Sequence, residues 1–300
     1  MTFSKHFRML PILILISCQP LPSEPESGSK SEIAETDKTW TAEELELQSV
    51  VERFLTVAGN FDLAAMDSLI TEKANLGIGI MRDGEWVTSV ITIEEYFESV
   101  RNRAELRPFY EPVRKWTIEV NQGQLAFVGA DAVLYRFGVP LSRNNDYFTL
   151  IRQGGEWKFM NLSFTNLPLS PDSVSFSPEA FARGYAQAWS GIRPEFVAAF
   201  FAEDGSLRVN DGEAAIGREA IAGVARGFMT DLPDMVVRYD SLINTPAGTE
   251  FHWTLIATHA GTGNPVNVSG YEEWQLEEGR IKTSQGHFPS DEYQRQVEGR

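Results

Sequence analysis

Four side chains toward the C-terminal end of the sequence are of types that can move protons. Glu272 stands beside Glu273, His287 lies on the following stretch, and His259 lies on the preceding one. A carboxylate and an imidazole within hydrogen-bond distance form an acid–base pair, which can take a proton from the carbon beside a carbonyl group. The sequence therefore offers Glu272 with His287, or with His259, as candidate catalytic residues of an isomerase, cyclase or hydratase.

Strand periodicity limits this hypothesis. Successive side chains of a β-strand point to opposite faces, so only one of Glu272 and Glu273 can face a protein interior. The same alternation places Thr283, Gln285 and His287 together on one face of the last predicted strand. The alternative interpretation is that the acid is a surface charge and that His287 only hydrogen-bonds a loop.

Metal and phosphate chemistry have less support. His252 and His259 are seven residues apart on one predicted strand and so point to opposite faces. With His287 they form at most a loose pair, whereas a metal site needs a spaced set of ligands. The loop Gly261-Thr262-Gly263-Asn264 lacks the lysine and the following helix of a phosphate loop. We therefore expect neither a metal nor a cofactor.

A row of aromatic side chains follows helical spacing after Ser177. Ser177 is a good N-cap and Pro178 suits the first helical position, so a helix is predicted to begin there. Phe181, Tyr185 and Trp189 then lie on one face of it. A helix buries one face in any case, so the row is expected either to be core or to cover the opening of a pocket.

The two halves of the sequence show the same order of elements. Capping boxes at Thr41–Glu44 and Thr92–Glu95 mark two helix starts, and alternation of apolar residues marks the strands. Strand-like runs lie at 74–81, 116–120, 125–128, 133–137, 147–151 and 157–164, and again at 236–242, 250–259, 266–276 and 281–288. A proline-rich break separates the halves. We expect two α+β domains, residues 41–168 and 175–295, each with three helices packed on a curved, mostly antiparallel sheet.

This order resembles the nuclear transport factor two-like fold, a cone of sheet closed by helices. The second half more specifically resembles the SnoaL-like polyketide cyclase family, over about 110 residues, a typical domain length. The motifs that carry the resemblance are Tyr185-Ala186-Gln187-Ala188-Trp189, Gly217-Arg218-Glu219-Ala220-Ile221, Leu232-Pro233-Asp234, Trp253-Thr254, Thr258-His259-Ala260-Gly261 and Gly270. The resemblance implies a mostly apolar pocket within the cone.

The resemblance also implies which residues line that pocket. Trp253 matches the family's inward tryptophan, His259 its histidine at the strand end, and Glu272 an acid that many relatives carry. Cyclase relatives end with an acid–base aspartate on the last strand, but residues 284–289 here contain none. This departure favours ligand binding over catalysis. The expected ligand-binding residues are Tyr185, Trp189, Trp253, His259 and Gln285.

The N-terminus is predicted to be a targeting segment. Lys5 and Arg8 precede a short apolar run that cannot span a bilayer as a stable helix. Residues 15–18, Leu-Ile-Ser-Cys, resemble the bacterial lipobox, which implies cleavage before Cys18 and acyl chains that anchor the protein. Residues 19–40 are rich in Pro, Ser and Glu, which predicts a flexible tether. The lipobox resemblance also implies the periplasmic face of the outer membrane, because Gln19 follows the cysteine where an Asp would favour retention in the inner membrane.

Net charge excludes one class of partner and leaves three functions open. A formal charge of -16 at pH 7 disfavours nucleic acid and charge-driven binding to anionic lipid. We expect an envelope lipoprotein that binds a small, largely apolar ligand without transforming it. The first alternative is an enzyme that uses Glu272 and His287. The second is a structural or protein-interaction module, in which the two domains form an intramolecular pseudo-dimer or the chain forms a homodimer.

Overall fold

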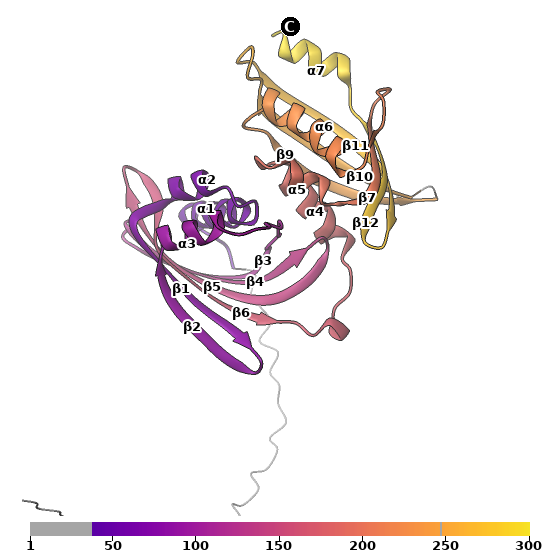
Figure 1. Ribbon diagram of the computed structural model, residues 1–300. Coiled ribbons are helices and arrows are strands. Elements are labelled where there is room, and N and C mark those ends of the chain that lie inside the picture. Colours follow the sequence, from indigo (N-terminus) through magenta and orange to yellow (C-terminus); the bar gives the residue numbers. More distant parts are fainter. Residues whose placement is uncertain (1–37, 247) are drawn as a thin grey trace, which may run out of the picture. The chain divides into compact units, whose positions relative to one another are not determined.

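The computed structural model describes residues 38–246 and 248–300 (Figure 1). The lipobox at Cys18 and nearly all of the expected tether lie outside these described residues. Residues 40–300 form one compact unit. None of the helices in residues 38–246 and 248–300 is long and apolar enough to cross a membrane.

The N-terminal domain is a six-stranded sheet with three helices. Its strands lie in the order β2-β1-β6-β5-β4-β3, and every neighbouring pair is antiparallel except β1 with β6. The elements are α1 (Ala42–Gly59), α2 (Leu63–Leu69), β1 (Ile70–Arg82), β2 (Glu85–Thr92), α3 (Ile93–Arg101), β3 (Val113–Asn121), β4 (Leu125–Arg136), β5 (Val139–Gln153) and β6 (Glu156–Pro168). Figure 1 shows the three helices on one face of the curved sheet.

Local chemistry fixes where the helices of this domain begin. The Thr41 and Thr92 hydroxyls each accept a hydrogen bond from the backbone three residues on, and the Glu44 and Glu95 carboxylates accept one from the backbone of Thr41 and Thr92, so both predicted capping boxes are confirmed. The apolar face of α1 is buried and includes Phe54, which packs on Phe148 and Phe159 of the sheet. The core of the domain therefore lies between the helices and the inner face of the sheet.

The C-terminal domain repeats the plan. Its strands lie in the order β8-β7-β12-β11-β10-β9, again with one parallel pair, β7 with β12. The elements are the 3-10 turn η1 (Pro171–Ser173), α4 (Pro178–Trp189), α5 (Pro194–Ala198), β7 (Phe201–Val209), β8 (Ala215–Ile216), α6 (Arg218–Asp231), β9 (Val236–Thr245), β10 (Gly248–Thr258), β11 (Pro265–Glu277), β12 (Arg280–His287) and α7 (Ser290–Val297). The predicted α+β class with two tandem cone-like domains is confirmed.

Two of the differences from the predicted pattern concern β4 and α7. The runs predicted at 125–128 and 133–137 belong to a single strand, β4, whose middle carries Gly129 and two alanines and so shows little periodic signal. Helix α7 was not predicted, because its sequence is polar and buries little beyond Val297. Side-chain hydrogen bonds hold it in place: Gln296 Oε1 accepts from the Asn267 backbone at 2.6 Å, and Gln296 Nε2 donates to the Asn267 carbonyl at 3.0 Å.

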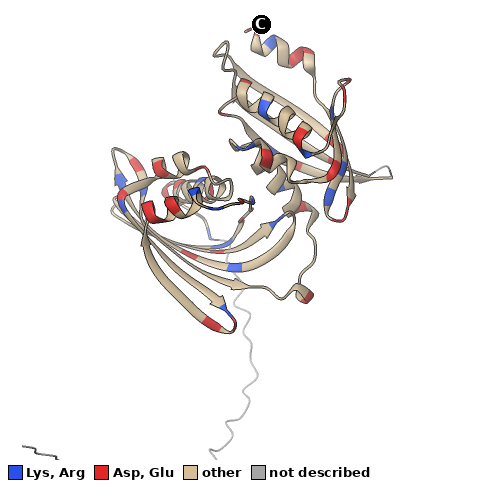
Figure 2. Cartoon of the chain, in the orientation of Figure 1, with Lys and Arg blue, Asp and Glu red and all other residues tan. Residues whose placement is uncertain are grey.

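Charged side chains are spread over both domains. Figure 2 shows Asp and Glu residues on the helices and at strand ends, with Lys and Arg residues scattered among them. Most of the ion pairs join partly or fully exposed groups, such as Arg101 with Glu94 and Lys282 with Asp204. Such pairs contribute little to stability, so the fold depends chiefly on its two apolar cores.

Candidate functional site

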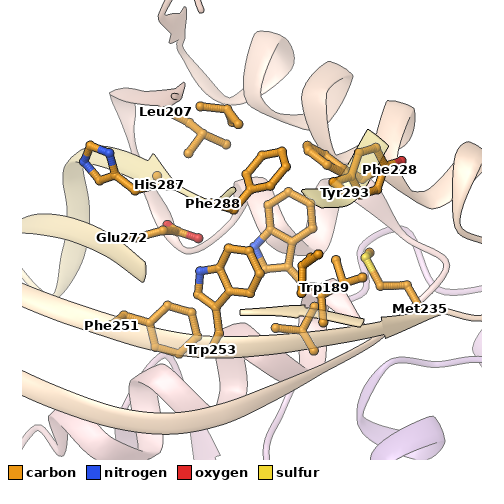
Figure 3. Close-up of a pocket in the computed structure, with 15 residues that line it drawn as sticks. Trp189, Leu207, Phe228, Met235, Phe251, Trp253, Glu272, His287, Phe288 and Tyr293 are labelled. Atoms are coloured by element: carbon orange, nitrogen blue, oxygen red, sulfur yellow. The ribbon is translucent and has the colours of Figure 1, made fainter. Parts of the chain in front are cut away.

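The C-terminal cone contains a small apolar pocket (Figure 3). Its walls come from α4, α6, the strands of the sheet and the segment after β12, and they include Trp189, Phe228, Phe251, Trp253 and Phe288. Its volume is about 60 Å³. A cavity of about 150 Å³ is needed to hold a benzene ring. The pocket therefore fits a few heavy atoms, and a sterol-sized ligand would require it to widen.

Glu272 is the buried acid of this pocket. Its Oε2 accepts three hydrogen bonds: from Ser284 Oγ at 2.6 Å, from Trp274 Nε1 at 2.9 Å and from Tyr185 Oη at 3.2 Å. Within residues 38–246 and 248–300 no donor reaches its Oε1. Burial raises the pKa of Glu272, and the three hydrogen bonds oppose that rise without cancelling it. Hydrogen bonds to Oε2 thus hold the carboxyl group in position, while Oε1 accepts none.

Strand register explains why Glu272, and not Glu273, is inside. Glu272 pairs with Gly286 of β12, and Trp274 pairs with Ser284, so these four residues share the inner face. Gly286 has no side chain and leaves room beside the carboxyl group. Figure 3 shows that group directed toward the rings of Trp189 and Trp253.

Tyr185 supports the carboxylate from behind the pocket. The ring is fully buried, packs edge-on against Phe251 and Trp274, and does not line the pocket. Burial, then the nearby charge of Glu272, raises the pKa of the Tyr185 hydroxyl, which therefore stays protonated and donates. Tyr185 is a positioning residue in this geometry, whereas Trp189, one helical turn later, reaches the pocket.

The structure does not bring His287 to Glu272. His287 pairs with Tyr271 in the sheet and stacks on its ring at 4.7 Å between centroids. Its Nε2 lies 3.5 Å from Glu273 Oε2. Figure 3 shows the imidazole pointing away from the carboxyl group of Glu272. Thr283, Gln285 and His287 share one face of β12, as the alternation predicts, and it is opposite to the face of Glu272, although His287 also borders the pocket.

Like Tyr185, the predicted ligand-binding residues His259 and Gln285 lie outside the pocket. His259 follows the end of β10, where its Nδ1 accepts a hydrogen bond from the Thr262 backbone at 3.2 Å and so stabilises a turn. Gln285 donates to the Asn210 carbonyl at 2.9 Å. Of all the predicted site residues, Trp189, Trp253, Glu272 and His287 border the pocket.

A second cavity, in the N-terminal cone, contains polar residues that the sequence analysis missed. It has a volume of about 280 Å³ and is bordered by Glu111, Asn144 and Asp146, all buried. One feature of the sequence indicates these buried polar residues. Asn144 and Asp146 continue, at strand spacing, the inward series that ends in Phe148 and Leu150, so polar side chains at these positions must face the interior.

The two domains have the nuclear transport factor two-like fold, here as two cones in tandem. Residues 182–283 match the family model of the SnoaL-like domain, and residues 42–165 match a model described as putative lumazine-binding. No curated protein matches the sequence. The C-terminal cone thus has the fold of a family that includes ligand-binding proteins, cyclases and isomerases, and a fold of this kind supports several functions.

Solved structures similar to the chain include three bacterial proteins. A hypothetical protein of ketosteroid isomerase-like fold from Catenulispora acidiphila, in complex with trimethylamine, is 20% identical over 41% of this chain and 94% of its own, with a TM-score of 0.38. A putative SnoaL-like polyketide cyclase from a Jannaschia species is 11% identical over 35% and 79%, with a TM-score of 0.33. A putative polyketide cyclase from Bacillus cereus is 13% identical over 43% and 85%, with a TM-score of 0.37.

Proposed function

We propose that this chain is an envelope lipoprotein whose SnoaL-like cone binds a small, largely apolar molecule without transforming it. The isolation of Glu272 carries the proposal. Its hydrogen-bond partners in the described chain are a serine, a tyrosine and a tryptophan, none of which is an effective base at neutral pH. Moving a proton from one atom of a substrate to another is most effective with an acid and a base in reach. The pocket has apolar walls and one fixed carboxyl group, which suit binding.

Two polar atoms define the ligand more narrowly. Trp253 Nε1 is enclosed and, like Trp189 Nε1 and His287 Nε2 of the same pocket lining, has no hydrogen-bond partner within residues 38–246 and 248–300. Figure 3 shows this nitrogen and the carboxyl group of Glu272 at the same end of the pocket. A hydroxyl group can accept from the indole N–H and donate to Glu272 Oε1 at once. The ligand is therefore a short aliphatic alcohol, or a longer molecule whose hydroxylated tip enters the pocket.

Short alcohols are expected to bind to the full chain and to change its tryptophan fluorescence. The proposal predicts that ethanol and 1-propanol bind more tightly than ethers of the same size, because an ether cannot donate to Glu272. Gly286→Ala should weaken binding roughly tenfold. The added Cβ would lie at ordinary contact distances, 3.7 Å from Glu272 Cγ and 3.5 Å from the Arg208 carbonyl oxygen, so the sheet is kept while the pocket shrinks.

A matched control is available on α6. Gly227→Ala adds the same methyl group where no atom lies within 4 Å, outside the pocket lining, so binding should be unchanged. Equal affinity for alcohols and ethers, or equal effects of the two substitutions, would count against the proposal.

Catalysis by Glu272 alone is the second candidate, and the raised pKa of this buried carboxyl group favours it. Its direct readout is exchange of the hydrogens beside the carbonyl group of butanone in D2O, followed by NMR. The binding proposal expects no exchange above the buffer background. Exchange that disappears in Glu272→Gln, with the variant still folded, would replace binding by proton transfer as the function.

The envelope anchor is tested separately. Cys18→Ser, expressed in a bacterial host, should abolish incorporation of labelled palmitate and move the chain from the detergent-rich phase to the aqueous phase, because the acyl chains supply the membrane affinity. The neighbouring Ser17→Ala is a matched control and should remain in the detergent-rich phase. Incorporation of palmitate that is undiminished in Cys18→Ser would show that the lipid is not attached there.

A further inference from the structure

The cavity in the N-terminal cone has aromatic walls and an acidic end. Rings from α1, α3, β5 and β6 border it, among them Phe54, Tyr96, Phe148 and Phe164. Its volume of about 280 Å³ exceeds the space that a single aromatic ring requires. A molecule with one ring and a short polar arm would therefore fit without displacing the walls.

Four polar side chains at one end of the cavity hold one another in place. Asn166 Nδ2 donates to Ser142 Oγ at 2.6 Å and to Asn144 Oδ1 at 2.9 Å, and Ser142 Oγ also donates to Asn144 Oδ1 at 3.0 Å. The amide oxygen of Asn144 is thus occupied, and its Nδ2 donates to Glu111 Oε1. This network fixes Glu111 on the segment that precedes β3.

Asp146, the second acid, has no such support. It is 4% exposed, and its Oδ2 is enclosed without a hydrogen-bond partner in the described part of the chain. Its cross-strand neighbours are Ala130 on β4 and Phe164 on β6, which offer no polar atom. Removing a carboxyl group from water without a partner costs free energy, so this acid destabilises the empty domain.

No cation of the described chain neutralises the two acids. Arg103 and Arg136 also border the cavity, but neither forms an ion pair with Glu111 or Asp146. Arg103 is exposed, and its guanidinium lies over the Phe61 ring. The two lining arginines therefore form no ion pair with the buried carboxyl groups, and Arg136 Nε is itself enclosed without a hydrogen-bond partner in the described part of the chain.

We propose that this cavity binds a small organic ammonium ion, with the charged nitrogen between Glu111 and Asp146 and the apolar body against the aromatic rings. An ammonium group supplies several N–H donors, which would satisfy the oxygen that Asp146 leaves unpaired. The faces of aromatic rings attract cations, so the walls favour the same ligand. The site lies in a different domain from the SnoaL-like pocket, and the inference does not depend on the function proposed for that pocket.

Binding of an ammonium ion should change the protonation of Glu111 and Asp146, and this change can be measured. Burial raises the pKa of Glu111 to about 7, and burial, then the charges of Glu111 and Asp131, raise the pKa of Asp146 to about 9. The empty pair therefore holds a proton near neutral pH, while Tyr96, whose pKa burial also raises, stays neutral. An ammonium ion stabilises the ionised carboxylates, so its binding must release a proton to the buffer.

Benzylamine is the probe, and benzyl alcohol is its uncharged counterpart. Titration calorimetry of the full chain near neutral pH, in two buffers of different ionisation enthalpy, should show benzylamine binding at least tenfold more tightly than benzyl alcohol. The difference between the two buffers should correspond to release of about one proton per ligand bound. Binding of both compounds with equal affinity, or binding of benzylamine without proton release, would overturn the proposal.

Two shape-conserving variants locate the site. Asp146→Asn and Glu111→Gln should each weaken benzylamine binding at least tenfold, and Asp146→Asn should remove most of the proton release. Glu272→Gln, in the other domain, should leave both quantities unchanged. If one of the two cavity variants does not fold, the other variant and the two-buffer measurement on the unaltered chain still test the proposal. Undiminished binding in both variants, or binding lost only in Glu272→Gln, would refute this site.

Discussion

Gly270→Ala is expected to destabilise the C-terminal cone by about 3 kcal/mol, at the upper end of the cost of overpacking a core. A Cβ at this position would lie 2.4 Å from the carbonyl oxygen of His287 and 2.7 Å from Cζ2 of Trp253. The backbone oxygen cannot move without breaking the pairing of β11 with β12. Gly270 therefore allows the Trp253 ring to lie across the strand and form the pocket wall.

Urea unfolding followed by fluorescence and by circular dichroism measures this effect. Gly223→Ala on α6 is the matched control, because no atom lies within 4 Å of its added Cβ and alanine favours a helix over glycine by about 1 kcal/mol. The double variant Gly270→Ala/Trp253→Leu should recover only part of the loss, since it removes the ring but not the His287 carbonyl. If Gly270→Ala unfolds at the same urea concentration as the unaltered chain, β11 and β12 do not approach as closely as described.

The free energy of unfolding is expected to fall as pH rises from about 5 to about 9, chiefly through Asp146. Its pKa is raised from the usual 3.8 to about 9, so over this range the folded chain holds a proton that the unfolded chain has lost. Stability contributed by the protonated carboxyl group is complete below its unfolded pKa and is lost as pH approaches the folded value. Glu111, raised from 4.5 to about 7, acts in the same direction, as does Glu272.

Asp146→Asn should therefore reduce this fall by at least about 2 kcal/mol, since each pKa unit corresponds to about 1.36 kcal/mol. The decrease of the free energy of unfolding with pH that remains in this variant is due to Glu111 and Glu272. Urea midpoints measured at several pH values give the result. Asp83→Asn is a suitable control because it makes the same change in an exposed turn, and asparagine tolerates the positive φ of 51° found there. Parallel pH profiles for the unaltered chain and Asp146→Asn would show that Asp146 does not carry the proton.

Local features of the sequence predict most of the elements and their order. The starts of α1, α3 and α4 follow from Thr41, Thr92 and Ser177, whose side chains bond the backbone three residues on. The hairpin between β5 and β6 turns at Gly154-Gly155, both with positive φ. These features are local: each depends on residues close in the chain, so their residue types alone specify them. The two-domain α+β arrangement follows from repetition of the same order.

Only the tertiary structure decided which polar residues meet. Alternation leaves two solutions for Glu272 and Glu273, and the face on which the helices pack selects Glu272. The same choice sends His287 outward to Glu273. Glu111 and Asn144 are 33 residues apart and belong to no motif, so their contact becomes visible only when β5 is placed in the cone. Cavity volume depends on how all the surrounding side chains pack, and no single stretch of sequence contains that information.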